Sequence, residues 1–138
     1  MANMAAKMFA AVLEEKEVNY SYLDEEQTVI RVGWKLDASK ISIFFKFSEE
    51  STNVHFEGHE FLNVAADKVE TMYKICNQCN REYRWVKFTV NEENKEIVVE
   101  GDAVIQLDSC GMECFELMIR TTQIVEDAYP KFMKAMWA

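Results

Sequence analysis

The chain has 138 residues, 49% of them hydrophobic and 28% charged, with a formal net charge of −9 and a pI near 4.7. A chain of this length buries roughly 65 to 70% of the surface that its unfolded form exposes, so we expect one domain over residues 1–138. The acidic balance argues against nucleic acid and anionic membranes as partners, because phosphate-rich surfaces attract clustered Lys and Arg. No apolar run approaches the roughly 20 residues that span a bilayer, and we expect a cytoplasmic protein without a signal peptide.

The first half of the chain predicts a helix followed by a strand meander. Residues 2–16 have the pattern of an amphipathic helix, with an apolar side made of Met8, Phe9, Val12 and Leu13. Alternating apolar and polar residues follow in four short stretches, at residues 18–22, 28–36, 41–47 and 53–61. This period of two predicts four antiparallel strands, and Gly58 inside the last of them is interpreted as a bulge.

The second half is organised around residues 67–107, where a helix leads directly into a β-hairpin. Apolar residues first recur at helical spacing, at Val69, Met72, Tyr73, Cys76 and Cys79. Apolar and polar residues then alternate on both sides of a polar turn, which predicts two strands of a hairpin. We expect the apolar side of the helix to pack on this hairpin. Asp67 and Glu70 have the spacing of a capping box and are expected to fix the start of the helix.

A long C-terminal helix completes the predicted architecture. Asp108 or Ser109 is expected to cap it, and Pro130 is expected to kink or break it because proline lacks a backbone donor. The element order is then α-β-β-β-β-α-β-β-α. We predict an α+β domain with an antiparallel curved sheet of about five to six strands, covered on one face by three helices.

Four segments of the second half form a characteristic set: CNQCN at residues 76–80, WVKF at 85–88, VVEGD at 98–102 and YPKFM at 129–133. Together they resemble the YbjN-like family of bacterial proteins, over residues 64–137. The resemblance implies a fold like that of type III secretion chaperones and a role as a sensory-transduction regulator without established enzymatic activity. The resemblance assigns no catalytic residue to this sequence. Asn77 and Asn80 match the family's Asn-x-x-Asn pattern, and we interpret both as structural.

Two groups of side chains have the composition of a metal site. The first is a set of four thiols, Cys76, Cys79, Cys110 and Cys114. The second is one face of the fourth predicted strand, with His55, Glu57 and His59. Buried reduced thiols and an ordinary solvent-exposed strand face explain the same residues, so we predict no metal and no cofactor. A metal-binding or small-molecule-sensing protein built on either group is the alternative function.

The favoured function is non-catalytic binding of another protein. Nucleophile motifs and Gly-rich phosphate loops are absent from a sequence with four glycines, so an enzyme is not expected. The sheet face away from the helices is expected to carry apolar residues among charged ones: Val29, Phe44, Tyr83, Trp85, Val98 and Val104. Because aromatic anchors in a charged surround are typical of protein contacts, we predict that these residues bind a partner segment or a second copy of the chain.

Overall fold

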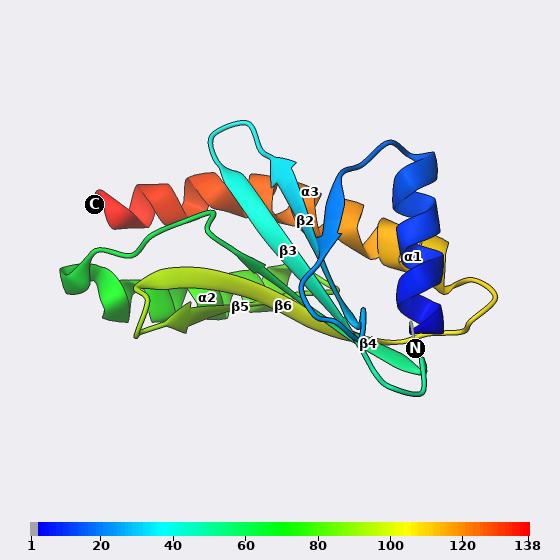
Figure 1. Cartoon of the computed structure of the whole chain (residues 1–138). Helices are drawn as coiled ribbons and strands as arrows, with labels where there is room; N and C mark the ends of the chain where they lie inside the picture. The colour runs from blue at the N-terminus through cyan, green and yellow to red at the C-terminus, as the bar shows by residue number, and fades with distance from the viewer. Residues whose placement is uncertain (1–2) are drawn as a thin grey trace.

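The computed structural model describes residues 3–138 and has the predicted order of elements (Figure 1). Within this range there are three α-helices, α1 (Met4–Glu15), α2 (Val69–Glu82) and α3 (Cys110–Met136), and a 3₁₀ turn, η1 (Ala66–Lys68). The strands are β1 (Tyr20–Tyr22), β2 (Val29–Lys35), β3 (Lys40–Phe47), β4 (Asn53–His59), β5 (Lys87–Asn91) and β6 (Glu96–Val104). All pairings are antiparallel, in the order β1-β2-β3-β4-β6-β5.

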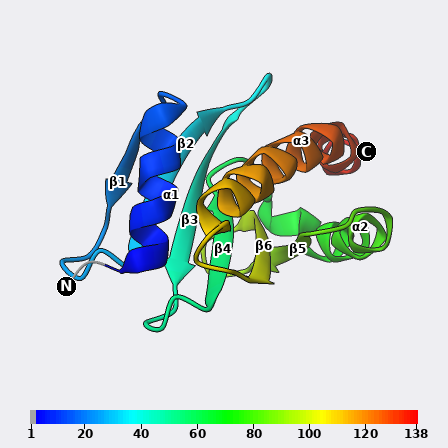
Figure 2. The same ribbon diagram turned by 90° about the vertical axis from the view of Figure 1, so that its right-hand side faces the viewer.

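The helices cover one face of this curved, open sheet, which confirms the predicted α+β fold (Figure 2). Helix α1 packs on β2 and on α3, and α2 packs on β5 and on α3. Aromatic rings mark the two halves of the core. The ring of Phe9 on α1 lies 4.6 Å from that of Phe45 on β3, and Phe132 on α3 lies 5.3 Å from Phe88 on β5, as centroid distances. The buried side chains of the three helices and of the sheet form one hydrophobic core, to which α3 contributes.

Strand register separates the two faces of the sheet. One row of paired residues, buried or half-buried toward the helices, contains Ile30, Phe45, Phe56 and Gly101. The neighbouring row points the other way and contains Arg31, Phe44, Glu57 and Glu100. Successive side chains of a strand alternate between faces, so the second row belongs to what we call the open face. Its main residues are Arg31, Phe44, Lys46, His55, Glu57, His59, Val98, Glu100 and Asp102.

Helix α1 begins at Met4 because Asn3 caps it. The Asn3 side-chain oxygen accepts hydrogen bonds from the Ala6 backbone N–H at 3.1 Å and from the Ser51 hydroxyl at 3.0 Å. The Asn3 amide donates to the Ser48 carbonyl at 2.8 Å. These bonds fasten the start of α1 to the turn between β3 and β4.

Three expectations about the helices are wrong. The capping box is absent, because Asp67 lies in the preceding 3₁₀ turn and Lys68 holds the N-cap position without a side-chain bond. Tyr73 is 44% exposed and faces away from the core. The break expected as one possibility at Pro130 does not occur: helix α3 continues to Met136, and buried Phe132 anchors the turn beyond the proline. Ser109 does hold the N-cap position of α3, although its side chain makes no capping bond.

Gly58 is not a bulge. It pairs regularly with Ile43 on β3 and with Val99 on β6, so the ladder is uninterrupted. A Cβ atom at this position would lie 2.6 Å from the Ile41 Cδ1 atom and 2.7 Å from the Val99 Cγ1 atom. Glycine is present because the core leaves no room for a side chain there.

Candidate functional sites

The structure separates the six predicted partner-binding residues, and Tyr83 and Trp85 are not on the open face. Tyr83 ends α2; its hydroxyl donates to the Asp127 carboxylate on α3 and accepts from the Lys131 ammonium at 2.9 Å. Burial and the bond to Asp127 raise the pKa of Tyr83. The expected placement is wrong because β5 begins at Lys87, so strand alternation does not extend back to residues 83–85.

Trp85 lies beside α3, at an exposed groove. Its side chain is 56% exposed and stacks against the Arg120 guanidinium, whose central carbon is 5.3 Å from the ring centroid. Trp85 has a φ of 77°, uncommon for a bulky residue, and its carbonyl oxygen lies so close to Gly101 that a Cβ there would be 2.8 Å away. The groove, which we call the Trp85 groove, has a volume of about 500 Å³ and is lined by Trp85, Ala103, Val104, Ile105, Met112, Glu113, Glu116, Leu117 and Arg120.

The remaining predicted contact residues differ in exposure. Val104 is 83% exposed and lines the Trp85 groove. Val98 is on the open face but buried, and Phe44 is half-buried with its ring edge-on to His59 at 5.6 Å between centroids. Val29 is half-buried at the start of β2. Of the six residues, Trp85 and Val104 therefore have the side chains most accessible to a partner.

A chain of charged residues crosses the open face around Glu57. The two ring nitrogens of His55 have different carboxylate partners: Nδ1 lies 2.8 Å from Asp102 Oδ1, and Nε2 lies 3.1 Å from Glu57 Oε2. The Lys46 ammonium donates to the same Glu57 oxygen at 3.1 Å. Burial alone would raise the pKa of Glu57, but hydrogen bonds from Lys46 and His59 and the nearby positive charge outweigh it, so the pKa is lowered.

His59 repeats this arrangement on the other side of Glu57. Its Nε2 atom lies 3.2 Å from Glu57 Oε1, and its Nδ1 atom lies 3.3 Å from Glu96 Oε2. Glu96 is buried and also accepts from the backbone N–H of Glu60 at 3.1 Å. Glu96 could not be predicted from the sequence, because charged residues near a hairpin turn are usually solvated and the pairing that buries it joins residues distant in sequence.

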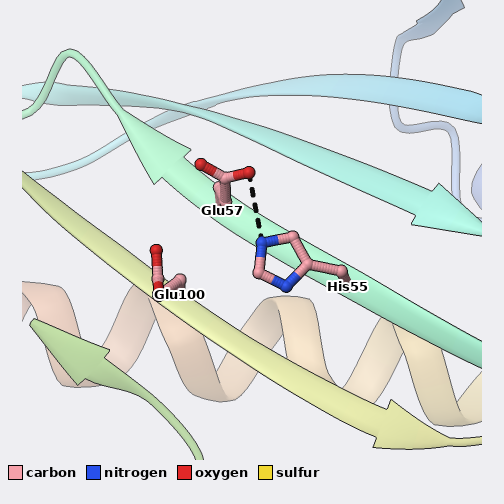
Figure 3. A group of neighbouring side chains, drawn as sticks. All are labelled: His55, Glu57 and Glu100. Carbon is pink, nitrogen blue, oxygen red and sulfur yellow. Dashed lines mark hydrogen bonds and ion pairs between the residues drawn. The ribbon is translucent and has the colours of Figure 1, made fainter.

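The predicted set of His55, Glu57 and His59 is brought together, but the group with converging ligand atoms is different. His55, Glu57 and Glu100 each offer one ligand atom, and these atoms lie within 4.8 Å of one another (Figure 3). Glu100 comes from β6, where it pairs with Glu57 of β4. Alternation could place Glu100 on this face, but only the register of β4 with β6 identifies it as the neighbour of Glu57.

The four thiols do not form one cluster. All four are buried and unpaired as disulfides. Cys79 is close enough to Lys131 for the ammonium to influence its pKa, whereas Cys114 lies seventeen positions earlier on α3, roughly 25 Å along a helix axis. Burial raises the pKa of Cys76 and of Cys114 to about 12. A shared four-thiol metal site, one of the alternatives from the sequence, is therefore excluded by the positions of the two pairs.

Comparison with known families decides the identity of the domain. The profile of the YbjN family, described as "Putative bacterial sensory transduction regulator", matches residues 5–132. The chain belongs to the YbjN family. This assignment confirms the resemblance seen in the sequence and extends it to α1 and the strand meander. No curated protein matches the sequence.

Two solved structures share the YbjN fold of this chain. The crystal structure of YbjN from E. coli has a TM-score of 0.62 at 10% identity and covers 91% of each chain. A chain of the ExsC–ExsE complex has a TM-score of 0.55 at 13% identity, covering 88% of this chain and 90% of that one. No helix within residues 3–138 is both long and apolar enough to cross a membrane.

Proposed function

We propose that this YbjN-family protein is a non-catalytic regulator that binds a segment of another protein in the Trp85 groove. The observation that carries the proposal is the exposure of Trp85, Val104 and Met112 around one groove; each side chain is more than half exposed. Large exposed apolar side chains in a concave surface with a charged rim are typical of protein contacts. The similarity to a chain of the ExsC–ExsE complex, a complex between two proteins, supports the same function.

The lining of the groove favours an apolar segment as the ligand. Ala103, Ile105 and Leu117 form its less exposed part, whereas Trp85 and Met112 are exposed beside it. Tryptophan supplies a large contact area and methionine adapts to different shapes, so the two together suit an apolar side chain of a partner. Glu113, Glu116 and Arg120 line the same groove and supply charged groups. Partner segments with apolar residues flanked by polar ones fit this composition.

The buried thiols support a role without catalysis by cysteine. A nucleophilic cysteine needs a lowered pKa and access to solvent, whereas burial raises the pKa of all four thiols here. Four buried cysteines without disulfides also fit a reducing compartment, so we propose the cytoplasm as the site of action.

Affinity capture with paired tryptophan variants tests the groove. Wild type, Trp85→Ser and Trp137→Ser would be used to capture proteins from the native cell extract, followed by mass spectrometry. Trp137 is the matched control because it is 80% exposed and does not line the groove. We expect a protein retained by wild type and Trp137→Ser to be lost with Trp85→Ser. Identical captured proteins for all three, with each variant folded by circular dichroism, would contradict the proposal.

A second copy of the chain is the other partner that the groove fits. Sedimentation velocity over a range of concentrations distinguishes the two cases. If the groove joins two copies, the wild type sediments as a dimer and Trp85→Ser as a monomer. If the partner is another protein, both sediment alike and differ only in capture.

A further inference from the structure

Each ring nitrogen of His55 faces a carboxylate, but a neutral imidazole can donate a hydrogen bond to only one of the two. When a neutral His55 donates its Nδ1–H to Asp102, the lone pair on Nε2 points at Glu57 Oε2, 3.1 Å away. An ionised carboxylate only accepts hydrogen bonds, so the two lone pairs repel unless a proton or a metal cation lies between them. His55 does not line the Trp85 groove, so a cation at His55 does not depend on the proposed partner binding.

The surroundings favour a cation. The carboxylates of Glu57, Glu96, Glu100 and Asp102 gather around the two imidazoles. Lys46 is the ammonium group that bonds to this set, through Glu57. The side chain of Glu57 is about four-fifths buried and that of Glu96 is more buried, which limits the screening of their negative charges by water. The site therefore combines negative charge, partial burial and a directed nitrogen lone pair.

We propose that His55 Nε2, Glu57 and Glu100 bind a divalent transition-metal ion of the zinc class. One imidazole and two carboxylates suit zinc or manganese better than calcium, which takes an all-oxygen shell. A solvent molecule completes four-fold coordination. Asp102 holds the Nδ1 side of the ring, as carboxylates do for metal-bound histidines, and so is a positioning residue.

The backbone already places the three ligands together. His55 and Glu57 are two residues apart on β4 and share a face, and Glu100 is the direct cross-strand partner of Glu57. Their ligand atoms lie within 4.8 Å of one another, while ligands at tetrahedral zinc are about 3.4 Å apart. Rotation of the glutamate side chains closes this gap without moving the strands. Figure 3 shows the three side chains on the side of β4 and β6 opposite to α3.

Zinc titration of tag-free protein stripped with a chelator tests the site, with isothermal titration calorimetry as the readout. We expect saturable binding of one Zn²⁺ per chain. Affinity should fall at least about tenfold in His55→Gln and Glu100→Gln, and about 10- to 100-fold in Asp102→Ala, which removes the group that accepts from the ring. The matched comparison is His59→Gln, because His59 bonds to Glu57 but is not a ligand. The glutamine amide can still donate to the Glu57 carboxylate, so the zinc affinity should fall less in His59→Gln than in His55→Gln.

Lys46→Met supplies a change in the opposite direction. Removing the ammonium that shares the Glu57 oxygen should raise the zinc affinity, while the fold is retained by circular dichroism. Cobalt(II) in place of zinc should give a spectrum without thiolate charge-transfer bands, because no cysteine takes part. The proposal is overturned if wild type shows no saturable zinc binding, if His59→Gln loses as much affinity as His55→Gln, or if cobalt reports thiolate ligands.

Discussion

Asn80 joins the end of α2 to the edge of the sheet through both groups of its carboxamide. Its oxygen accepts from the Phe88 backbone N–H at 2.6 Å, and its nitrogen donates to the Phe88 carbonyl at 3.0 Å. Since β5 is the last strand of the sheet, this side chain takes the place of a neighbouring strand. The structural role inferred from the sequence is thus confirmed for Asn80, but it acts across the fold and not as a helix cap.

Asn80→Ala should lower the free energy of unfolding by about 2 kcal/mol, because two hydrogen bonds to half-buried backbone groups are lost. The measurement is urea denaturation followed by circular dichroism. Asn77→Ala is the matched control, since Asn77 lies one turn earlier on the same helix and is exposed. Equal effects of the two substitutions would show that the bonds to Phe88 contribute nothing to stability.

Two glycines of the sheet, Gly33 on β2 and Gly58 on β4, differ in what surrounds them, and this difference can be tested. Gly58→Ala should destabilise by about 1 to 3 kcal/mol, because the added methyl group meets Ile41 and Val99 of the core. Gly33→Ala on β2 should be neutral or slightly stabilising, since nothing lies within 4 Å of its Cβ position. Thermal denaturation of both variants checks the difference, and a larger loss at Gly33 would contradict the assignment of faces.

Phe88 is the residue of β5 on which the helices converge. Its ring contacts Phe61, Tyr83 and Phe132, with centroids 5.3 to 6.5 Å apart. Phe88→Ala should cost about 3 to 5 kcal/mol through loss of burial and a cavity. Thr89→Ala, the exposed neighbour on the same strand, should cost less than about 1 kcal/mol on the scale of strand propensities. Chemical denaturation ranks the two, and the reverse order would place Phe88 outside the core.

The elements themselves could be predicted from the sequence, because their periods of 2 and 3.6 are local properties. The positions of Trp85 and Glu100 could not. Trp85 lies in the connection between α2 and β5, where neither the helical nor the strand period applies. Its ring contacts Arg120 on α3, a residue distant in the sequence. Glu100 becomes a neighbour of Glu57 only through the pairing of β4 with β6, which depends on the register of distant strands.

At the scale of the whole molecule, β6 connects the two candidate sites. Its open side carries Glu100 and Asp102, and residues 103–104 at its end line the Trp85 groove. The Trp85 groove is lined mainly by α3, although Val104 points to the open face at the end of β6. Figure 3 shows His55 on the side of the sheet opposite to α3. A failure of zinc binding therefore leaves the proposed partner binding untouched, and the reverse also holds.

Alkaline pH should weaken the whole fold, because burial raises the pKa of Cys76 and Cys114 from 9.0 to about 12. A raised folded-state pKa gives stability that is complete below pH 9 and is lost as pH rises toward 12, since only the unfolded chain deprotonates in that window. Each thiol then removes about 1.4 kcal/mol per pH unit. Burial also raises the pKa of Tyr20 and Tyr22, which adds to the loss.

The measurement is urea denaturation from pH 8 to pH 11 under a reducing agent. The free energy of unfolding should be level up to about pH 9 and then fall by roughly 3 kcal/mol per unit for two thiols. A Cys76→Ala, Cys114→Ala double variant should begin from lower stability but lose it less steeply, because the two titrating groups are gone. The small cavities that the alanines leave lower the free energy of unfolding at every pH, but they do not change its slope against pH. Equal slopes for wild type and the double variant would show that these thiols are already accessible to solvent in the folded protein.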